Sequence, residues 1–182
     1  MRTKLLLAAL LLPLALPLQA ALAPGAKAPI FTAPGASAGK PLDVNLAAAL
    51  KNGPVVLYFF PAAFTKGCNA EAHAFAEALP DFTKAGATVI GMTAGNVDQL
   101  QKFSSEYCAG KFAVAAASPA IVKGYDVLLK KPDGTPSTVT SRTSFVIAPN
   151  GRILFAHTDM NPGDHVKLTL QAVRNYRAGK RN

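Results

Sequence analysis

Cysteine, histidine and acidic residues are all scarce in this sequence. It contains no tryptophan, two cysteines, three histidines and only 10 Asp or Glu among 182 residues. Two cysteines cannot make a disulfide-dense scaffold, so the fold must depend on its hydrophobic core. The isolated positions of His157 and His165 do not suggest a metal site. These absences exclude a small disulfide-stapled domain and leave the two cysteines as the side chains to examine.

Basic residues outnumber acidic ones, giving a formal net charge of +9. An excess of this size can indicate a nucleic-acid partner. Here the charges are scattered, and only residues 174–181 approach a cluster, in which Tyr176 is the single aromatic residue, too few for a base-stacking surface. We therefore interpret the charge as a solvated basic surface that attracts anionic partners, and expect no nucleic-acid partner.

The N-terminus has the pattern of a secretory signal peptide. Two basic residues in the first four positions precede an apolar run over residues 5–18 and then small residues. This run is shorter than the roughly 20 residues that a membrane-spanning helix needs. We expect residues 1–20 to be a signal peptide, cleaved after Ala20 or Ala23, and residues 21–182 to form one domain, exported to a bacterial periplasm. An uncleaved membrane anchor is the alternative.

Hydrophobic periodicity alternates between strand and helix along the rest of the chain. Continuous apolar runs predict buried strands at residues 55–60 and 88–92, with a weaker strand at 112–116. Apolar spacing and turn residues predict helices at 42–50, 66–84, 97–107, 119–124 and 163–176.

Turn residues divide the remaining segments. Residues 24–41 form a lead-in with at most short strands, and residues 131–138 form an exposed loop. A Pro-Asn-Gly turn predicts a hairpin of strands at 144–148 and 152–157. This order predicts an α/β fold, a three-layer sandwich with a central mixed β-sheet flanked by helices.

Cys68 stands where a predicted buried strand turns into a helix. Unpaired N–H groups and the helix dipole at that place favour a thiolate. Thr65, three residues before Cys68, offers a hydroxyl that can donate or accept a hydrogen bond beside the thiol, and Pro61 closes the strand and shields the pocket from water. A guanidinium elsewhere in the chain can stabilise such a thiolate and the charge that develops on a leaving group, with its fixed fork of donors.

The spacing Pro61-x-x-x-Thr65-x-x-Cys68 resembles the active-site motif of the peroxiredoxins, a thioredoxin-fold family. The segment 58–71 is most similar to the bacterioferritin-comigratory, or PrxQ-like, branch. Further likenesses are the family's opening segment at residues 25–31 and its arginine-bearing strand at residues 141–147. The resemblance extends over about residues 25–176 and implies a thioredoxin-like fold.

The resemblance also implies a reaction and the residues that perform it. The protein would be a thiol-dependent peroxidase that reduces hydrogen peroxide or organic hydroperoxides through a sulfenic acid on Cys68. Thr65 would orient the peroxide, Pro61 would shield the thiolate, and Arg142 would activate both. No cofactor or metal is implied, because the cysteine itself performs the redox chemistry.

The chain departs from the branch at two positions and supplies a second thiol elsewhere. Lys66 replaces a frequent proline, and His73, which we interpret as an exposed helix residue, stands where many members have a resolving cysteine. Cys108 is the other internal thiol. Some members of the branch carry a resolving cysteine in the corresponding helix, which implies an intramolecular Cys68–Cys108 disulfide. Such a bond requires Cα atoms within roughly 7 Å.

Several alternatives stay open. Cys108 can instead form an intermolecular disulfide, remain a structural thiol, or take part in a permanent disulfide. If Cys108 is not the resolving residue, an external thiol would resolve Cys68. The reductant would be a thioredoxin-like protein or a small thiol, and the protein a monomer or weak dimer. A thioredoxin-type oxidoreductase usually needs Cys-x-x-Cys, but Glu71 occupies the second position. A binding or redox-sensing protein without efficient turnover is a further alternative, but such a protein would not need Thr65, Cys68 and Arg142 together.

Overall fold

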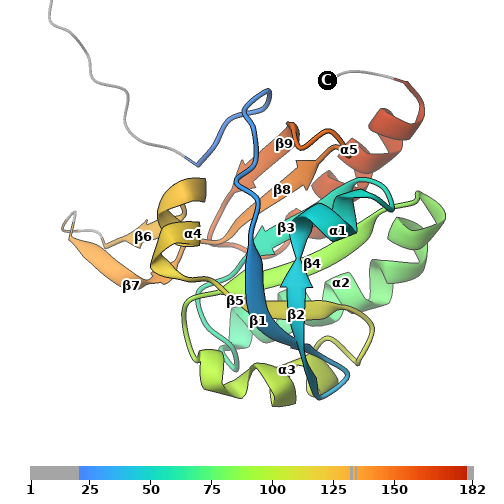
Figure 1. Ribbon diagram of the computed structural model, residues 1–182. Coiled ribbons are helices and arrows are strands. Elements are labelled where there is room, and N and C mark those ends of the chain that lie inside the picture. Colours follow the sequence, from blue (N-terminus) through green and yellow to red (C-terminus); the bar gives the residue numbers. More distant parts are fainter. Residues whose placement is uncertain (1–20, 132, 134, 180–182) are drawn as a thin grey trace, which may run out of the picture.

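A seven-stranded mixed sheet forms the centre of the structure (Figure 1). The computed structural model describes residues 21–131, 133 and 135–179, so the predicted signal peptide at 1–20 lies outside the described residues. The strand order is β2-β1-β5-β4-β3-β8-β9. These strands are β1 (Thr32–Ser37), β2 (Lys40–Asn45), β3 (Val55–Phe59), β4 (Thr88–Thr93), β5 (Ala113–Ala116), β8 (Thr143–Ile147) and β9 (Ile153–Thr158).

Helices cover both faces of this sheet (Figure 1). They are α1 (Leu46–Leu50), α2 (Lys66–Lys84), the 3-10 turn η1 (Val97–Gln99), α3 (Leu100–Glu106), α4 (Pro119–Tyr125) and α5 (His165–Arg177). Strand β3 is buried along its full length, and its side chains alternate between two hydrophobic clusters. One cluster includes residues of α1 and α4, and the other includes residues of α2, α3 and α5. The predicted three-layer α/β sandwich with a mixed sheet is confirmed.

The central strands β3, β4 and β5 run parallel to one another, and every other pair of neighbouring strands in the sheet is antiparallel. Parallel strands place their carboxyl ends at the same edge of the sheet, where loops collect functional groups. The hairpin predicted from the Pro-Asn-Gly turn is confirmed as β8–β9. Its strand β8 runs antiparallel to β3, so the start of β8 lies beside the end of β3.

The prediction of a helix at residues 42–50 is wrong in its first half. Residues 40–45 form β2, which pairs with β1 across a tight turn in which Ala38 and Gly39 both have positive φ. The helix α1 begins only at Leu46, where the Asn45 side chain accepts a hydrogen bond from the Ala48 N–H at 2.8 Å. The apolar spacing that predicted a longer helix does not report backbone pairing, and it is this pairing with β1 that makes residues 40–45 a strand.

Two other predicted segments also differ from the structure. The loop predicted at 131–138 overlaps β7 (Pro136–Thr140), which pairs with β6 (Leu128–Lys130) in a separate ribbon. The helix predicted at 97–107 is divided into η1 and α3, after Asn96 in the left-handed conformation. Both errors come from hydrogen bonding and backbone conformations that side-chain periodicity does not report.

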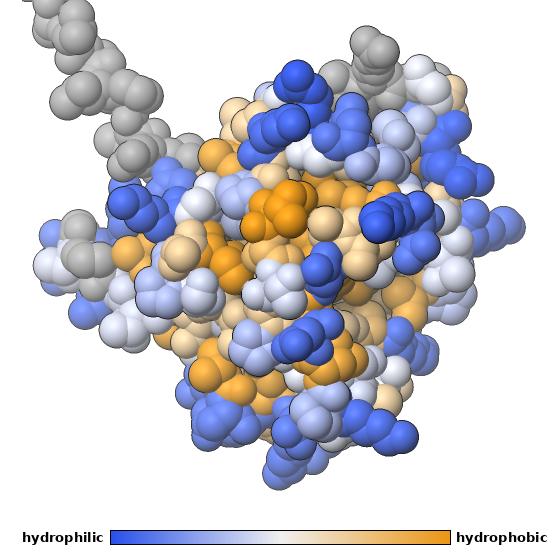
Figure 2. Space-filling model, viewed as in Figure 1, coloured by the Kyte–Doolittle hydropathy of each residue, from blue (hydrophilic) through white to orange (hydrophobic). Residues whose placement is uncertain are grey.

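The surface mixes polar and apolar residues. On the face seen in Figure 2, apolar atoms gather toward the centre and hydrophilic side chains project around the rim. The exposed large hydrophobic residues include Ile30, Leu42 and Met160. Within the described part of the chain, no helix has the length and apolarity needed to cross a membrane.

Candidate active site

Hydroxyl groups at the ends of β4 and β7 hold the loop that joins β3 to α2. The Thr140 hydroxyl donates to the Phe60 carbonyl at 2.6 Å, and the Thr93 hydroxyl donates to the Pro61 carbonyl at 2.9 Å. Thr93 and Thr140 are themselves fully buried. Pro61 is half-buried and follows the last paired residues of β3. These anchors fix the start of the loop and therefore the position at which α2 begins.

Cys68 lies in the first turn of α2, with only 1% of its surface exposed. The first N–H groups of a helix have no partner within it, and they direct partial positive charge toward this turn. Thr65 is the exposed N-cap residue, but its hydroxyl donates to the Ala62 carbonyl at 3.1 Å instead of capping the helix. Its oxygen keeps lone pairs that can accept a hydrogen bond from a peroxide.

Arg142 reaches Cys68 because of the register between β3 and β8. Phe59 pairs with Thr143, so the residue before Thr143 lies just beyond the end of β3, beside the loop that joins β3 to α2. The Nη2 atom of Arg142 lies 3.6 Å from the Cys68 Sγ. Gly67 leaves room for this approach, since a Cβ there would lie 3.1 Å from the same nitrogen.

The guanidinium of Arg142 is buried and oriented by two further acceptors. Its Nε donates to the Met160 carbonyl at 3.0 Å, and its Nη1 donates to the Glu71 carboxylate. Only 3% of Arg142 is exposed. The planar guanidinium therefore contacts a carbonyl, a carboxylate and a sulfur at the same time, which a lysine ammonium could not reproduce.

Glu71 stands one helical turn after Cys68 and is buried beneath Arg142. Burial raises the pKa of Glu71 to about 7, although the nearby Arg142 opposes this shift. The carboxyl and the guanidinium form a buried ion pair. In the sequence, Glu71 was considered only as the residue that stands where a Cys-x-x-Cys motif has its second cysteine. Its spacing of three residues from Cys68, which places both side chains on one face of a helix, was the signal that could have assigned it to the site.

Histidines of the chain occupy contrasting positions. The side chain of His73 is exposed and lies 3.3 Å from Glu77, as expected for a surface helix residue. His165 is fully buried beneath the site, and burial lowers its pKa to about 4, so its imidazole is neutral at pH 7. Residue spacing gave His165 no role, because contact between α5, β8 and α2 cannot be seen in the sequence.

Cys108 is buried just after the end of α3 and belongs to the same hydrophobic cluster as Cys68. Neither sulfur forms a disulfide in the structure. Burial raises the pKa of the Cys108 thiol. Phe64, in the loop before Cys68, packs edge-to-face on Phe103 and Tyr107 with ring centroids 5.6 and 5.5 Å apart. The segment before Cys68 is therefore in direct contact with the helix that leads to Cys108.

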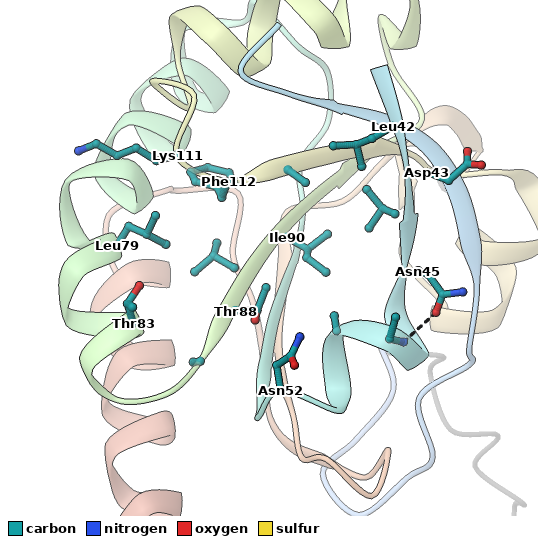
Figure 3. Close-up of a pocket in the computed structure, with 16 residues that line it drawn as sticks. Leu42, Asp43, Asn45, Asn52, Leu79, Thr83, Thr88, Ile90, Lys111 and Phe112 are labelled. Carbon is teal, nitrogen blue, oxygen red and sulfur yellow. Dashed lines mark hydrogen bonds between the residues drawn. The ribbon is translucent and has the colours of Figure 1, made fainter. Parts of the chain in front are cut away.

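Two hollows lie at the surface away from Cys68. One, of about 530 Å³, lies between β2, α1 and α2, with Asn52, Thr88 and Lys111 among its lining residues (Figure 3). The other, of about 580 Å³, lies between α4 and the β6–β7 ribbon. The lining of neither hollow includes Cys68, Thr65 or Arg142.

The described residues also contain no cluster of three or more His, Cys, Asp or Glu side chains suited to a metal ion.

The fold and the thiol–guanidinium contact define a thioredoxin-like α/β protein with redox chemistry centred on cysteine. The sequence model of the AhpC/TSA family matches residues 24–156, so the chain belongs to the AhpC/TSA family. It is a peroxiredoxin, a thiol-dependent peroxidase.

Individual relatives support the same assignment. The chain is 28% identical to peroxiredoxin Q of Sedum lineare over 75% of this chain and 70% of that protein. It is 27% identical to peroxiredoxin Bcp of Xanthomonas campestris over 66% of this chain and 76% of that protein. Among solved structures it resembles peroxidoxin BcpB from Mycobacterium tuberculosis, with a TM-score of 0.70, 27% identity, and coverage of 83% of this chain and 96% of that one.

Proposed function

We propose that Cys68 is the peroxidatic nucleophile and that it reduces hydrogen peroxide or organic hydroperoxides. The contact that carries this proposal is the one between the Cys68 Sγ and the Arg142 Nη2, at 3.6 Å in a buried site. The thiolate attacks one peroxide oxygen, the O–O bond breaks, and the sulfur becomes a sulfenic acid. The other oxygen leaves with the bonding electron pair and takes a proton to become water or an alcohol.

The surrounding groups act on the charge that moves during this step. Arg142 lies beside the attacking sulfur, where a fixed guanidinium stabilises the thiolate and the charge that develops on the leaving oxygen. Thr65 stands at the exposed mouth of the site with an oxygen able to accept from the peroxide O–H and so orient it. Pro61 closes the loop between β3 and α2 and keeps water from the thiolate.

Cys108 resolves the sulfenic acid in this proposal. Its thiol attacks the Cys68 sulfur, a disulfide forms, and the sulfenic oxygen leaves as water. Cys68 is in the first turn of α2 and Cys108 follows the last turn of α3, and helix ends open more readily than helix centres. Local opening at either end can bring the two Cα atoms within roughly 7 Å. A thioredoxin-like protein or a small thiol then reduces the disulfide, and the protein works as a monomer or weak dimer.

Oxidation with one equivalent of hydrogen peroxide tests this pairing. We expect the protein to lose two hydrogen atoms by intact mass and to migrate as a monomer on a non-reducing gel, because the disulfide is internal. The matched Cys108→Ser variant should instead retain a sulfenic acid on Cys68 that dimedone traps. A disulfide-linked dimer would assign Cys108 to an intermolecular bond. Unchanged turnover of Cys108→Ser with a thioredoxin-like reductant would remove Cys108 from the cycle.

We propose in addition that the protein is exported, on the basis of its basic, apolar and small-residue N-terminal pattern. In a bacterial host, the expected product is a periplasmic chain that begins at Ala21 or Pro24. Mass spectrometry of the N-terminal peptide in each cell fraction measures this directly. An intact Met1 in the membrane fraction would favour an uncleaved anchor, and an intact Met1 in the cytoplasm would contradict export.

A further inference from the structure

Buried polar side chains from three distant segments meet behind Arg142. Glu71 comes from α2, Ser144 from β8, and His165 is the first residue of α5. The His165 Nδ1 lies 2.8 Å from the Ser144 Oγ and 3.8 Å from the Glu71 Oε1. Each of these side chains is at most 1% exposed. Burying a polar group without a partner is costly, so this arrangement requires that the imidazole satisfy specific neighbours.

Hydrogen bonding fixes the tautomer of His165. Its Nε2 lies 2.9 Å from the Asp159 carbonyl oxygen, which can only accept, so Nε2 carries the proton. The imidazole is neutral because burial lowers the pKa of His165, with further lowering by His157 and Arg142 and opposing effects from the Asp159 carbonyl and side chain. The Nδ1 lone pair therefore accepts from the Ser144 hydroxyl, and the neutral ring forms no true ion pair with Glu71.

Two routes lead from His165 to Arg142. The first is the backbone: His165 Nε2 holds the Asp159 carbonyl, and the next carbonyl, that of Met160, accepts from the Arg142 Nε at 3.0 Å. The Asp159 N–H also donates to the Arg142 carbonyl at 3.2 Å. The second route is packing: the Glu71 Oε1 forms no hydrogen bond, but it lies 3.8 Å from the His165 Nδ1, so the ring supports the carboxylate whose Oε2 accepts from Arg142.

We propose that His165 is a positioning residue of the peroxidatic site, which holds the guanidinium of Arg142 against Cys68 through the Asp159–Met160 backbone and through Glu71. This inference rests on the proposed role of Cys68 and extends it to α5, outside the sequence motif. His165 touches neither sulfur nor substrate. It acts by limiting the orientations of Arg142, and misplacing a catalytic group by about 1 Å can slow a reaction by about 100-fold.

Three substitutions separate the two routes. His165→Leu removes both polar contacts of the ring. His165→Gln can place an amide N–H near the position of Nε2 and keep the bond to the Asp159 carbonyl, whereas His165→Asn can place an amide near Nδ1 and keep the side that faces Ser144 and Glu71. We expect His165→Leu to slow the reaction of Cys68 with hydrogen peroxide by about 10- to 100-fold. His165→Gln should recover more of the rate than His165→Asn, because the backbone route contacts Arg142 most directly.

The measurement is stopped-flow reaction with hydrogen peroxide in a Cys108→Ser background, where Cys68 is the only thiol. Alkylation of Cys68 by iodoacetamide is measured in parallel. Because Cys68 is 1% exposed, a loosened fold should accelerate alkylation, whereas a misplaced Arg142 should slow the peroxide reaction without accelerating alkylation. Val173→Ala is the matched control, since Val173 is buried on the same helix α5 within the apolar cluster.

Two outcomes would overturn the proposal. One is a wild-type peroxide rate in His165→Leu. The other is a slower peroxide reaction with faster alkylation, reproduced by Val173→Ala, which would show that His165 only maintains the packing of α5. Failure of the proposed function would be seen separately, as peroxide consumption that survives Cys68→Ser.

Discussion

Replacing Cys68 with serine is expected to reduce peroxide consumption to the rate of buffer alone. Serine nearly preserves the size of the side chain and its place in the first turn of α2, so the buried site should stay folded. A hydroxyl next to Arg142 remains protonated at neutral pH and is a far weaker nucleophile than a thiolate. The assay follows hydrogen peroxide loss with excess dithiothreitol, using protein shown to be reduced and folded.

Cys108→Ser is the matched control for this variant. It removes the other thiol, which lies in the same hydrophobic cluster, but it leaves the contact between Cys68 and Arg142 unchanged. With dithiothreitol as reductant we expect Cys108→Ser to consume peroxide, because a small thiol can reduce the sulfenic acid directly. Consumption by Cys68→Ser with loss in Cys108→Ser would exchange the roles of the two cysteines and contradict the proposed mechanism.

The motif Pro61-x-x-x-Thr65-x-x-Cys68 could be located in the sequence because its parts are local. The buried run at β3, the proline that follows it and the cysteine at the start of α2 lie within a short segment, so period and turn residues locate them. Placing Arg142 near Cys68 required the family resemblance. The structure supplies the physical reason, which is the antiparallel register of β8 against β3.

The environment of Arg142 could not be predicted in the same way. Glu71 and His165 are distant in sequence, and they meet only because α2 and α5 pack side by side on one face of the sheet. The β1–β2 hairpin was not predicted for a related reason: β1 is rich in Pro, Gly and Ala, and backbone pairing with β2 specifies both strands. The pattern of side chains indicates which face of one helix or strand is buried, whereas the surroundings of Arg142 and the β1–β2 hairpin depend on contacts between elements.

Replacing Arg142 with lysine is expected to slow the reaction of Cys68 with peroxide by about 100- to 1,000-fold, the usual loss when one donor to a developing oxyanion is removed. The charge is kept, but a single ammonium cannot contact the Met160 carbonyl, Glu71 and the Cys68 sulfur together. Stopped-flow measurement in the Cys108→Ser background gives the rate. A rate within a few-fold of wild type would show that charge alone suffices and that the fork geometry is unimportant.

Arg142→Met separates the catalytic effect from the structural one. Removing the cation raises the pKa of the buried Glu71 above its value of about 7, because Arg142 is what lowers it. A carboxyl whose pKa is raised on folding stabilises the fold when protonated and loses that contribution as pH rises through the folded-state pKa. The stability deficit of Arg142→Met, up to about 3–5 kcal/mol for a broken buried pair, should therefore grow as pH rises above neutrality. Urea unfolding on both sides of neutrality measures it.

Adding Glu71→Gln to Arg142→Met removes the buried charge and should restore most of the stability at high pH. The peroxide rate should stay as low as in Arg142→Met, because no donor faces the leaving oxygen. Recovery of the rate together with the stability would mean that Arg142 serves only to balance Glu71. Recovery of stability alone would assign the guanidinium to the transition state and the carboxyl to holding it in place.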